Sequence, residues 1–383
     1  MRIVLVPLII FLLACFEIFA YLPRTEAGKP LLGYNLVLKE NVLTFENLQV
    51  LASRLGRMAR AVKVWLPVNS LHARVLENGS YGGWDFGFWD SVLELLVKEN
   101  LVIILDPWFR TTREFCPPDL TEDMLVMMNG KREWKGTKIP SVFHPRVRQF
   151  MREACEAIAV HYGKERQDIS QCIRAFVLFC EPYFYTQPSI GLCLEGSSLP
   201  LNYLIDEDPN HIEQDFGVQV ENLALFFREL RGIVRKHWDV DIMLVMDTMA
   251  FVWPPAWVEY VRLAKEADVL GVDPYPGNYE PIPWFSLELV LKRGLSLGKP
   301  LWITEWGYDA LAWRTGVRKL PSLEFTREFI RRSSRKGVEG ILYWNFFEFE
   351  VGGPIYSVYD PRRGELYEDS IELCETLKRL SEN

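Results

Sequence analysis

The chain has 383 residues, of which 49% are hydrophobic, and a net charge of −8. This is the composition of an ordinary globular protein, with no low-complexity tract that would suggest disorder. The negative charge, without a basic stripe interleaved with aromatic residues, argues against a nucleic-acid partner. The five histidines are scattered, and HxH, HExxH and CxxC spacings are absent, so we expect neither a metal site nor another bound cofactor.

Residues 1–20 are typical of a targeting segment. Arg2 precedes an apolar run from Ile3 to Phe16, which is short for a membrane-spanning helix and suits the core of a signal peptide. Cleavage after Ala20, lipidation at Cys15 and retention as an uncleaved anchor all stay open. We therefore expect a protein that is secreted, or anchored by this segment at the outer face of the cell membrane. Its other six cysteines would form disulfides or stay as free buried thiols.

From residue 31 onward, short apolar runs alternate with amphipathic helical patterns. The runs are continuous and rich in Val, Ile and Leu, as strands covered on both faces must be. Strands are predicted at 31–35, 61–66, 101–106, 173–180, 242–247, 269–273, 301–304 and 340–344. Helices are predicted at 44–59, 86–99, 145–162, 218–237, 255–266, 285–297, 321–336 and 368–381.

Eight strands, each followed by a helix, are the repeat of a closed barrel. An open doubly wound sheet rarely reaches eight strict repeats, and no Gly-rich phosphate motif follows the first strand. We therefore predict an α/β fold with a single (β/α)8 TIM barrel as the catalytic domain, spanning residues 31–383. The long loops at 107–144 and 182–215 follow the third and fourth strands, on the face where barrels carry their active sites.

Two of the strand ends carry a glutamate. Glu181 follows the fourth strand and Glu305 closes the seventh. A carboxylate at the end of an apolar run is costly to desolvate, so either one alone could be a structural partner of an arginine. Two at the same end of a barrel match the paired carboxylates, about 5 Å apart, that retaining glycoside hydrolysis requires.

Four strand ends together resemble the clan A glycoside hydrolases, the 4/7 superfamily. Cys180-Glu181-Pro182 resembles the Asn-Glu-Pro that closes strand four of that clan, and the segment 303–307, Ile-Thr-Glu-Trp-Gly, resembles its nucleophile strand. The segment 272–276, Val-Asp-Pro-Tyr-Pro, resembles strand six, and 342–344, Leu-Tyr-Trp, the end of strand eight. The nearest likenesses are family 5, with cellulases and mannanases, and family 42, with β-galactosidases.

The resemblance implies Glu181 as the acid/base and Glu305 as the nucleophile. It also implies that Tyr275 hydrogen-bonds the nucleophile and that Trp344 floors the subsite of the cleaved sugar. The expected activity is double-displacement hydrolysis of β-linked glycosidic bonds in an oligo- or polysaccharide substrate. Trp108 and Trp306 are further candidates for stacking on a sugar, and either could instead serve barrel packing.

Two positions depart from the clan's pattern. Cys180 stands where an Asn normally contacts the sugar 2-hydroxyl, and a thiol is a poor substitute. Strand two lacks the Arg that is common beside the nucleophile, and Asn69 or His72 could supply polar contacts instead. These departures leave a non-catalytic carbohydrate-binding barrel open as an alternative. A transglycosylase is the other alternative, because it would use the same glutamates and differ only in the acceptor.

Overall fold

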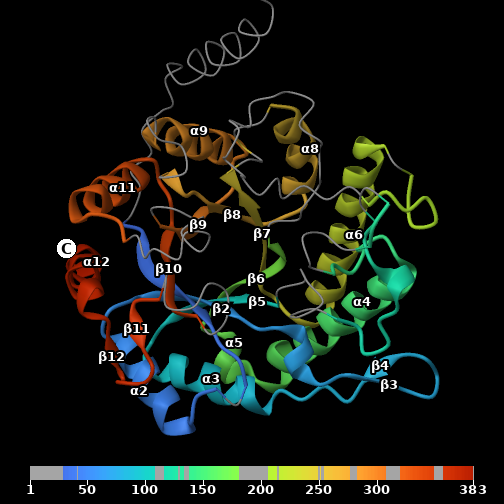
Figure 1. Cartoon of the computed structure of the whole chain (residues 1–383), viewed down its shortest axis with the longest axis horizontal. Coiled ribbons are helices and arrows are strands. Elements are labelled where there is room, and N and C mark those ends of the chain that lie inside the picture. The colour runs from blue at the N-terminus through green and yellow to red at the C-terminus, as the bar shows by residue number, and fades with distance from the viewer. Residues whose placement is uncertain are drawn as a thin grey trace, which may run out of the picture.

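The computed structural model describes residues 29–40, 42–107, 116–127, 130–132, 138–180, 206–213, 215–248, 251, 254–276, 283–307, 320–348 and 357–382. Eight parallel strands close into a barrel in the order β1-β10-β9-β8-β7-β6-β5-β2. Helices surround these strands (Figure 1). The predicted single (β/α)8 barrel is therefore confirmed.

All eight predicted strands are present. They are β1 (Leu31–Val37), β2 (Ala61–Trp65), β5 (Val102–Asp106), β6 (Ile173–Cys180), β7 (Asp241–Asp247), β8 (Val269–Asp273), β9 (Leu301–Trp306) and β10 (Gly340–Glu348). The fourth and seventh predicted strands, which precede or contain the two glutamates, are β6 and β9. Two short hairpins were not predicted, β3 (Arg74–Val75) with β4 (Tyr81–Gly82) and β11 (Tyr359–Asp360) with β12 (Glu365–Leu366).

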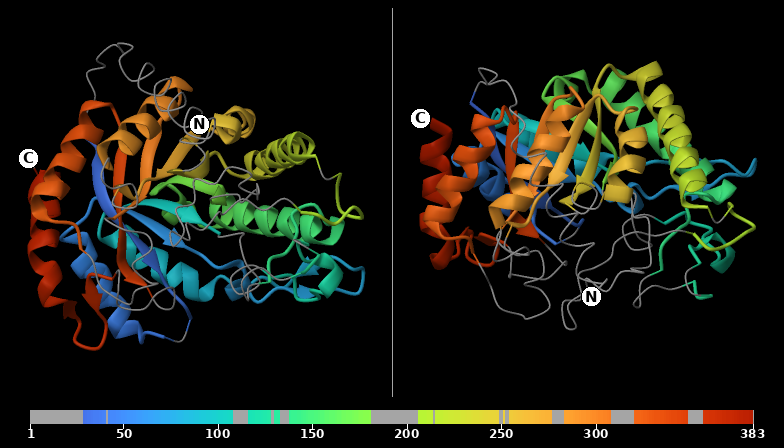
Figure 2. Two further views of the ribbon diagram at one scale, coloured as in Figure 1. Left: turned by 45° about the horizontal axis from the view of Figure 1, so that its top comes forward. Right: turned by 90° about the horizontal axis from the view of Figure 1, so that it is seen from above.

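The eight predicted helices are also present. They are α2 (Phe45–Gly56), α3 (Gly87–Lys98), α4 (Pro145–Val160), α6 (Phe216–His237), α8 (Pro254–Ala264), α9 (Pro283–Ser296), α11 (Leu323–Arg335) and α12 (Ile371–Glu382), with a short α5 (Gln167–Ser170). Thr44, Asp215 and Ser322 cap three of them by accepting a backbone N–H of the first turn. α4 and α6 pack side by side on one flank of the barrel (Figure 2).

The core has an inner and an outer part. Inward side chains such as Ala61, Trp65 and Trp302 fill the barrel, and outward ones such as Val62 and Val64 pack beneath the helices. Strict alternation fails in β6, where the register shifts between Val177 and Phe179, and at the β9–β10 pairing. Such irregularities re-aim side chains near a site, and here they decide which strand-end residues face inward.

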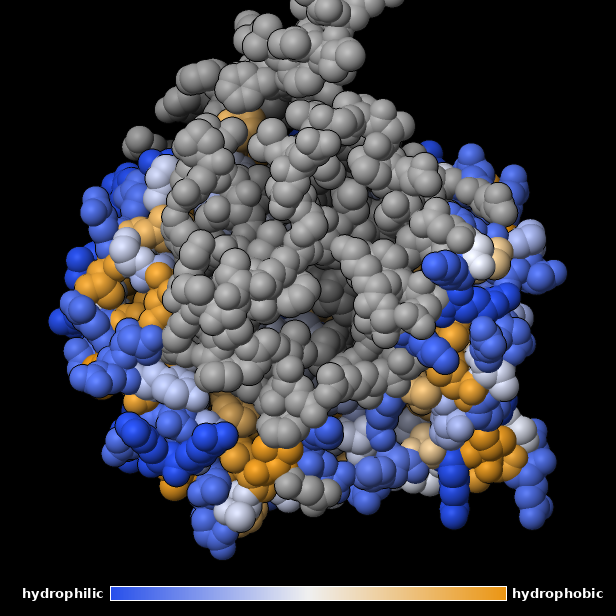
Figure 3. Space-filling model, viewed as in Figure 1, coloured by the Kyte–Doolittle hydropathy of each residue, from blue (hydrophilic) through white to orange (hydrophobic). Residues whose placement is uncertain are grey.

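Within the described residues, no helix is long and apolar enough to cross a membrane. Five cysteines lie in these segments and form no disulfide with one another: Cys116, Cys155, Cys172, Cys180 and Cys374. The targeting segment and the other two cysteines lie outside the described residues. On the face seen in Figure 3, the described surface is largely hydrophilic, with hydrophobic side chains in several small groups.

Candidate active site

Glu305 lies at the carboxyl end of β9, and only 7% of its surface is exposed. Each of its carboxylate oxygens has a separate partner. The phenol of Tyr275 donates to Oε2 at 3.1 Å, and the Nζ of Lys63 donates to Oε1 at 3.0 Å. The hydrogen bond expected between Tyr275 and Glu305 is thus present, while the lysine was not anticipated.

Lys63 reaches Glu305 from the middle of β2 and is fully buried. Its Nζ also lies 3.2 Å from Oδ2 of Asp106, at the end of β5, and 3.4 Å from Sγ of Cys180, at the end of β6. The ammonium has three hydrogens to donate, which matches these three neighbours. It lies 4.2 Å from the ring centroid of Trp65, two residues along the same strand.

The surroundings of Lys63 fix its charge. Burial acts to lower the pKa of the ammonium, but the carboxylates of Glu305 and Asp106 raise this pKa well above its usual range. Burial also raises the pKa of the Cys180 thiol well above its usual range. The thiol is therefore neutral at physiological pH, and the two carboxylates supply the negative charge that keeps Lys63 protonated.

The backbone beside Glu305 is held by buried polar side chains. Thr304 donates its hydroxyl to Oδ1 of Asp273, at the end of β8, at 2.5 Å. Asn35, on β1, donates to the carbonyl oxygen of Thr304 at 2.8 Å and accepts from Nε1 of Trp65 at 3.0 Å. Asn35 thereby links the strand of Lys63 to the strand of Glu305.

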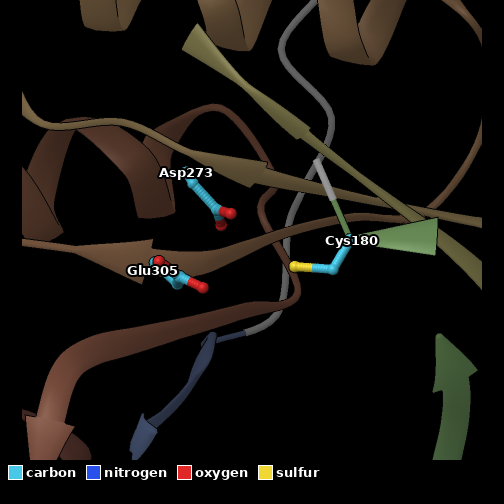
Figure 4. Close-up of side chains that lie close together, drawn as sticks. All are labelled: Cys180, Asp273 and Glu305. Carbon is cyan, nitrogen blue, oxygen red and sulfur yellow. The ribbon is translucent and has the colours of Figure 1, made fainter. Parts of the chain in front are cut away.

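Cys180, Asp273 and Glu305 point toward one another from three strands (Figure 4). Their ligand atoms lie within 4.8 Å of one another, a spacing that would suit a metal ion. Lys63 already places a cation 3.0 Å from the carboxylate of Glu305 and 3.4 Å from the thiol of Cys180. A metal ion would face repulsion from this ammonium, so we assign the charge balance of the cluster to the lysine.

Of the predicted tryptophans, Trp344 faces the barrel interior. It is 8% exposed, and its ring meets that of Trp65 edge-on, with 5.3 Å between centroids. Trp306 does not face the barrel interior and fills the packing role that was the alternative to stacking on a sugar. It is fully buried in the outer core and stacks on Phe329 of α11 at 4.5 Å. The register shift at the β9–β10 pairing turns Glu305 inward and Trp306 outward.

The polar residues proposed to replace the strand-two Arg have other contacts. Oδ1 of Asn69 accepts the backbone N–H of Cys116 at 2.6 Å, which ties down the loop after β5. The His72 side chain is 56% exposed and pairs with Glu40 at 2.7 Å. The cation beside the nucleophile candidate comes from Lys63, and contact of Asn69 or His72 with a sugar stays a prediction.

Glu181 and Trp108 lie outside the described residues, so their roles stay predictions. Cys180 lies in the cluster, as expected for the residue before the proposed acid/base. Lys63 was missed although the sequence carries a signal for it. A lysine between Val62 and Val64, in a strand read as covered on both faces, is as costly to desolvate as a strand-end glutamate.

No family model and no curated protein matches the sequence. Solved structures share the fold at low sequence identity. The β-galactosidase of the psychrophilic Marinomonas ef1 has a TM-score of 0.63 and 13% identity, over 93% of this chain and 59% of its own. The β-galactosidase of Halorubrum lacusprofundi has a TM-score of 0.63 and 12% identity, over 91% of this chain and 58% of its own. A hyperthermophilic β-glucosidase has a TM-score of 0.55 and 11% identity, over 92% of this chain and 100% of its own.

The chain thus spans less than two thirds of the length of these two β-galactosidases. Similarity at such low identity establishes the fold alone. The neighbours named here are glycoside hydrolases built on the same kind of barrel, so the comparisons confirm the predicted barrel fold.

Proposed function

We propose that this chain is a retaining glycoside hydrolase of β-linked oligo- or polysaccharides, with Glu305 as nucleophile and Glu181 as acid/base. The observation that carries the proposal is the Glu305 carboxylate, which is buried at the barrel mouth and bound on Oε1 by an ammonium and on Oε2 by a phenol. Both donors favour the ionised form, which is the form that attacks carbon.

The two glutamates would act in sequence. Glu305 attacks the anomeric carbon and forms a covalent glycosyl-enzyme, while Glu181 protonates the departing oxygen. Glu181 then removes a proton from water, which attacks the same carbon and releases Glu305. The indole of Trp344, inside the barrel mouth, would give the sugar's C–H face an apolar surface.

Lys63 bears on the alternative of a non-catalytic binding barrel. That alternative rested partly on the missing strand-two Arg, and a buried ammonium now stands against Glu305 in its place. A site that only binds sugar gains little from a carboxylate held ionised in this way, so we favour catalysis. Transglycosylation would use the same residues with a sugar as acceptor. The proposal that the protein is exported rests on residues 1–20 alone.

The test is the pair of variants Glu181→Gln and Glu305→Gln, assayed on aryl β-glycosides, β-glucan and mannan. We expect each to lower kcat by at least roughly 10²–10⁴-fold, the usual contribution of a positioned acid or base. Glu372→Gln, on the exposed surface of α12, is the matched control and should keep full activity. Activity that survives either change contradicts the proposal.

A second measurement separates the two roles. With an activated aryl β-glycoside and added azide, Glu305→Gly should yield the α-glycosyl azide, because azide replaces the missing nucleophile. Glu181→Ala should yield the β-glycosyl azide, because azide then attacks the covalent intermediate. Exchange of these two products would reverse the assignment.

A further inference from the structure

We propose that Lys63 is a positioning residue shared between Asp106 and Glu305, and that competition between these two carboxylates for one ammonium sets the charge and orientation of the nucleophile. This inference rests on the proposed role of Glu305. It goes beyond that role by naming the residues that tune it.

The sharing follows from the geometry of the ammonium. Nζ of Lys63 lies 3.0 Å from Oε1 of Glu305 and 3.2 Å from Oδ2 of Asp106. These distances are nearly equal, so neither carboxylate holds the charge alone. Because Lys63 is fully buried, bulk solvent does not reach the ammonium to replace either partner.

The Trp65 ring and its partner Asn35 fix the position of the ammonium. The Trp65 ring lies 4.2 Å from Nζ, measured to its centroid, and Asn35 accepts the indole N–H at 3.0 Å. Asn35 also bonds the carbonyl of Thr304, next to Glu305. A movement of Lys63 would therefore disturb both strands, which favours one fixed ammonium and two competing acceptors.

The groups around Glu305 leave Lys63 as its sole cationic contact among the described residues. β5 contributes Asp106, β6 the thiol of Cys180, β8 Asp273, and the segment after β8 Tyr275. Asp273 accepts from the Thr304 hydroxyl, and the Cys180 thiol is neutral. The charge of Glu305 should therefore respond to Lys63 and Asp106 with opposite signs.

Lys63→Met removes the cation that lies 3.0 Å from the Glu305 carboxylate, so the acid limb of the kcat/KM profile should move to higher pH. A shift of about one pH unit or more is expected for loss of a charge in direct contact. Asp106→Asn removes the competing negative charge, so the acid limb should move to lower pH. Lys63→Arg keeps the charge and should recover part of the wild-type profile.

The experiment measures these pH profiles on an activated aryl β-glycoside, together with the rate at which a 2-deoxy-2-fluoro glycosyl fluoride labels Glu305. Lys63→Met should slow labelling while leaving KM within a few-fold of wild type. Lys299→Met is the matched control: its Nζ bonds the backbone carbonyls of Lys265 and Ala267, in the loop before β8. It should leave the acid limb in place.

Titration of ¹³C-labelled glutamate carboxyl groups reads the same shifts without turnover, with Glu305→Gln identifying the signal. If Lys63→Met fails to fold, the titrations of Asp106→Asn and Lys63→Arg still test whether Lys63 is shared between the two carboxylates. An unmoved Glu305 signal, or an upward shift in Asp106→Asn, overturns the role of Lys63. The two variants could instead show opposite shifts while the wild-type protein neither hydrolyses the substrate nor becomes labelled. That result would uphold the coupling and overturn the proposed function.

Discussion

The phenol of Tyr275 lies 3.1 Å from Oε2 of Glu305, the carboxylate oxygen that the Lys63 ammonium does not bind. One donor lies on β2 and the other in the segment after β8, and together they occupy both oxygens. A carboxylate held in this way cannot rotate freely, and its charge is stabilised on both sides. This arrangement is the basis of the first prediction.

Tyr275→Phe should lower kcat/KM by roughly 10- to 100-fold, because a hydrogen bond to a charged group contributes about 1.5–3 kcal/mol. The ring stays in place, so substrate contacts of the aromatic face should be kept. Steady-state kinetics on an aryl β-glycoside gives the measurement. Tyr359→Phe, in β11, is the control, and an equal loss there would show that the effect is not specific to the Glu305 contact.

Trp306 and Trp344 should behave differently when truncated. Trp306→Ala empties a buried position against Phe329 and should lower the free energy of unfolding by about 3–5 kcal/mol, with KM little changed. Trp344→Ala should instead raise KM, because its ring faces the barrel interior. Denaturant unfolding and KM measured on both variants provide the check, and a reversed pattern would restore Trp306 as a substrate contact.

Gly271, on β8, leaves room for the residue before Glu305. A Cβ at this position would lie 2.7 Å from Cγ2 of Val245 and 2.9 Å from the side chain of Thr304. Gly271→Ala should therefore destabilise the protein by about 1–3 kcal/mol through overpacking, and lower kcat by displacing Thr304. Gly232→Ala, in α6, meets no atom within 4 Å and should be neutral or stabilising. Thermal unfolding and kcat of both variants decide.

The His211 side chain links the segment after β6 to the segment after β5 by hydrogen bonds. Its Nδ1 lies 2.7 Å from Oδ2 of Asp206, and its Nε2 lies 2.6 Å from the carbonyl oxygen of Asp123. Both partners are acceptors, so both nitrogens must carry a hydrogen and the ring is cationic. Burial acts to lower the pKa of His211, but Asp206 and the Asp123 carbonyl raise it above its ordinary value of 6.5.

A raised pKa contributes stability that is present below the unfolded-state pKa and is lost as the pH rises through the folded-state value. The difference in unfolding free energy between wild type and His211→Gln should therefore be largest near about pH 5 and shrink toward about pH 9. Denaturant titrations across this range test it. His72→Gln, at an exposed ring, should show a small difference, and a gap that widens with pH would contradict this link.

The barrel was predictable because its strands are continuous apolar runs and its helices are amphipathic. These are local patterns, and each predicted strand was found. Glu305 and Tyr275 were also predictable, since each closes or directly follows such a strand. Lys63 was within reach of the same reasoning, but a strand treated as uniformly apolar hides a lysine at its centre.

The direction of Trp306 was not predictable from its own neighbours. Alternation from the inward Trp302 would also place residue 306 inside the barrel. The outcome depends on the register shift in the pairing of β9 with β10, a strand that begins more than thirty residues later in the sequence. The same holds for Cys180, which faces inward only because β6 shifts register against β7.

The ion pair between Lys63 and Glu305 joins residues 242 positions apart, and β1 pairs with β10 to close the ring. The ring cannot close in a nascent chain that has not yet reached residue 340. Glu305 therefore acquires its cation in a fixed geometry only when the first and last strands meet. Hydrolysis would thus report ring closure during refolding, and the return of activity should track the slowest, most non-local step rather than the recovery of helix.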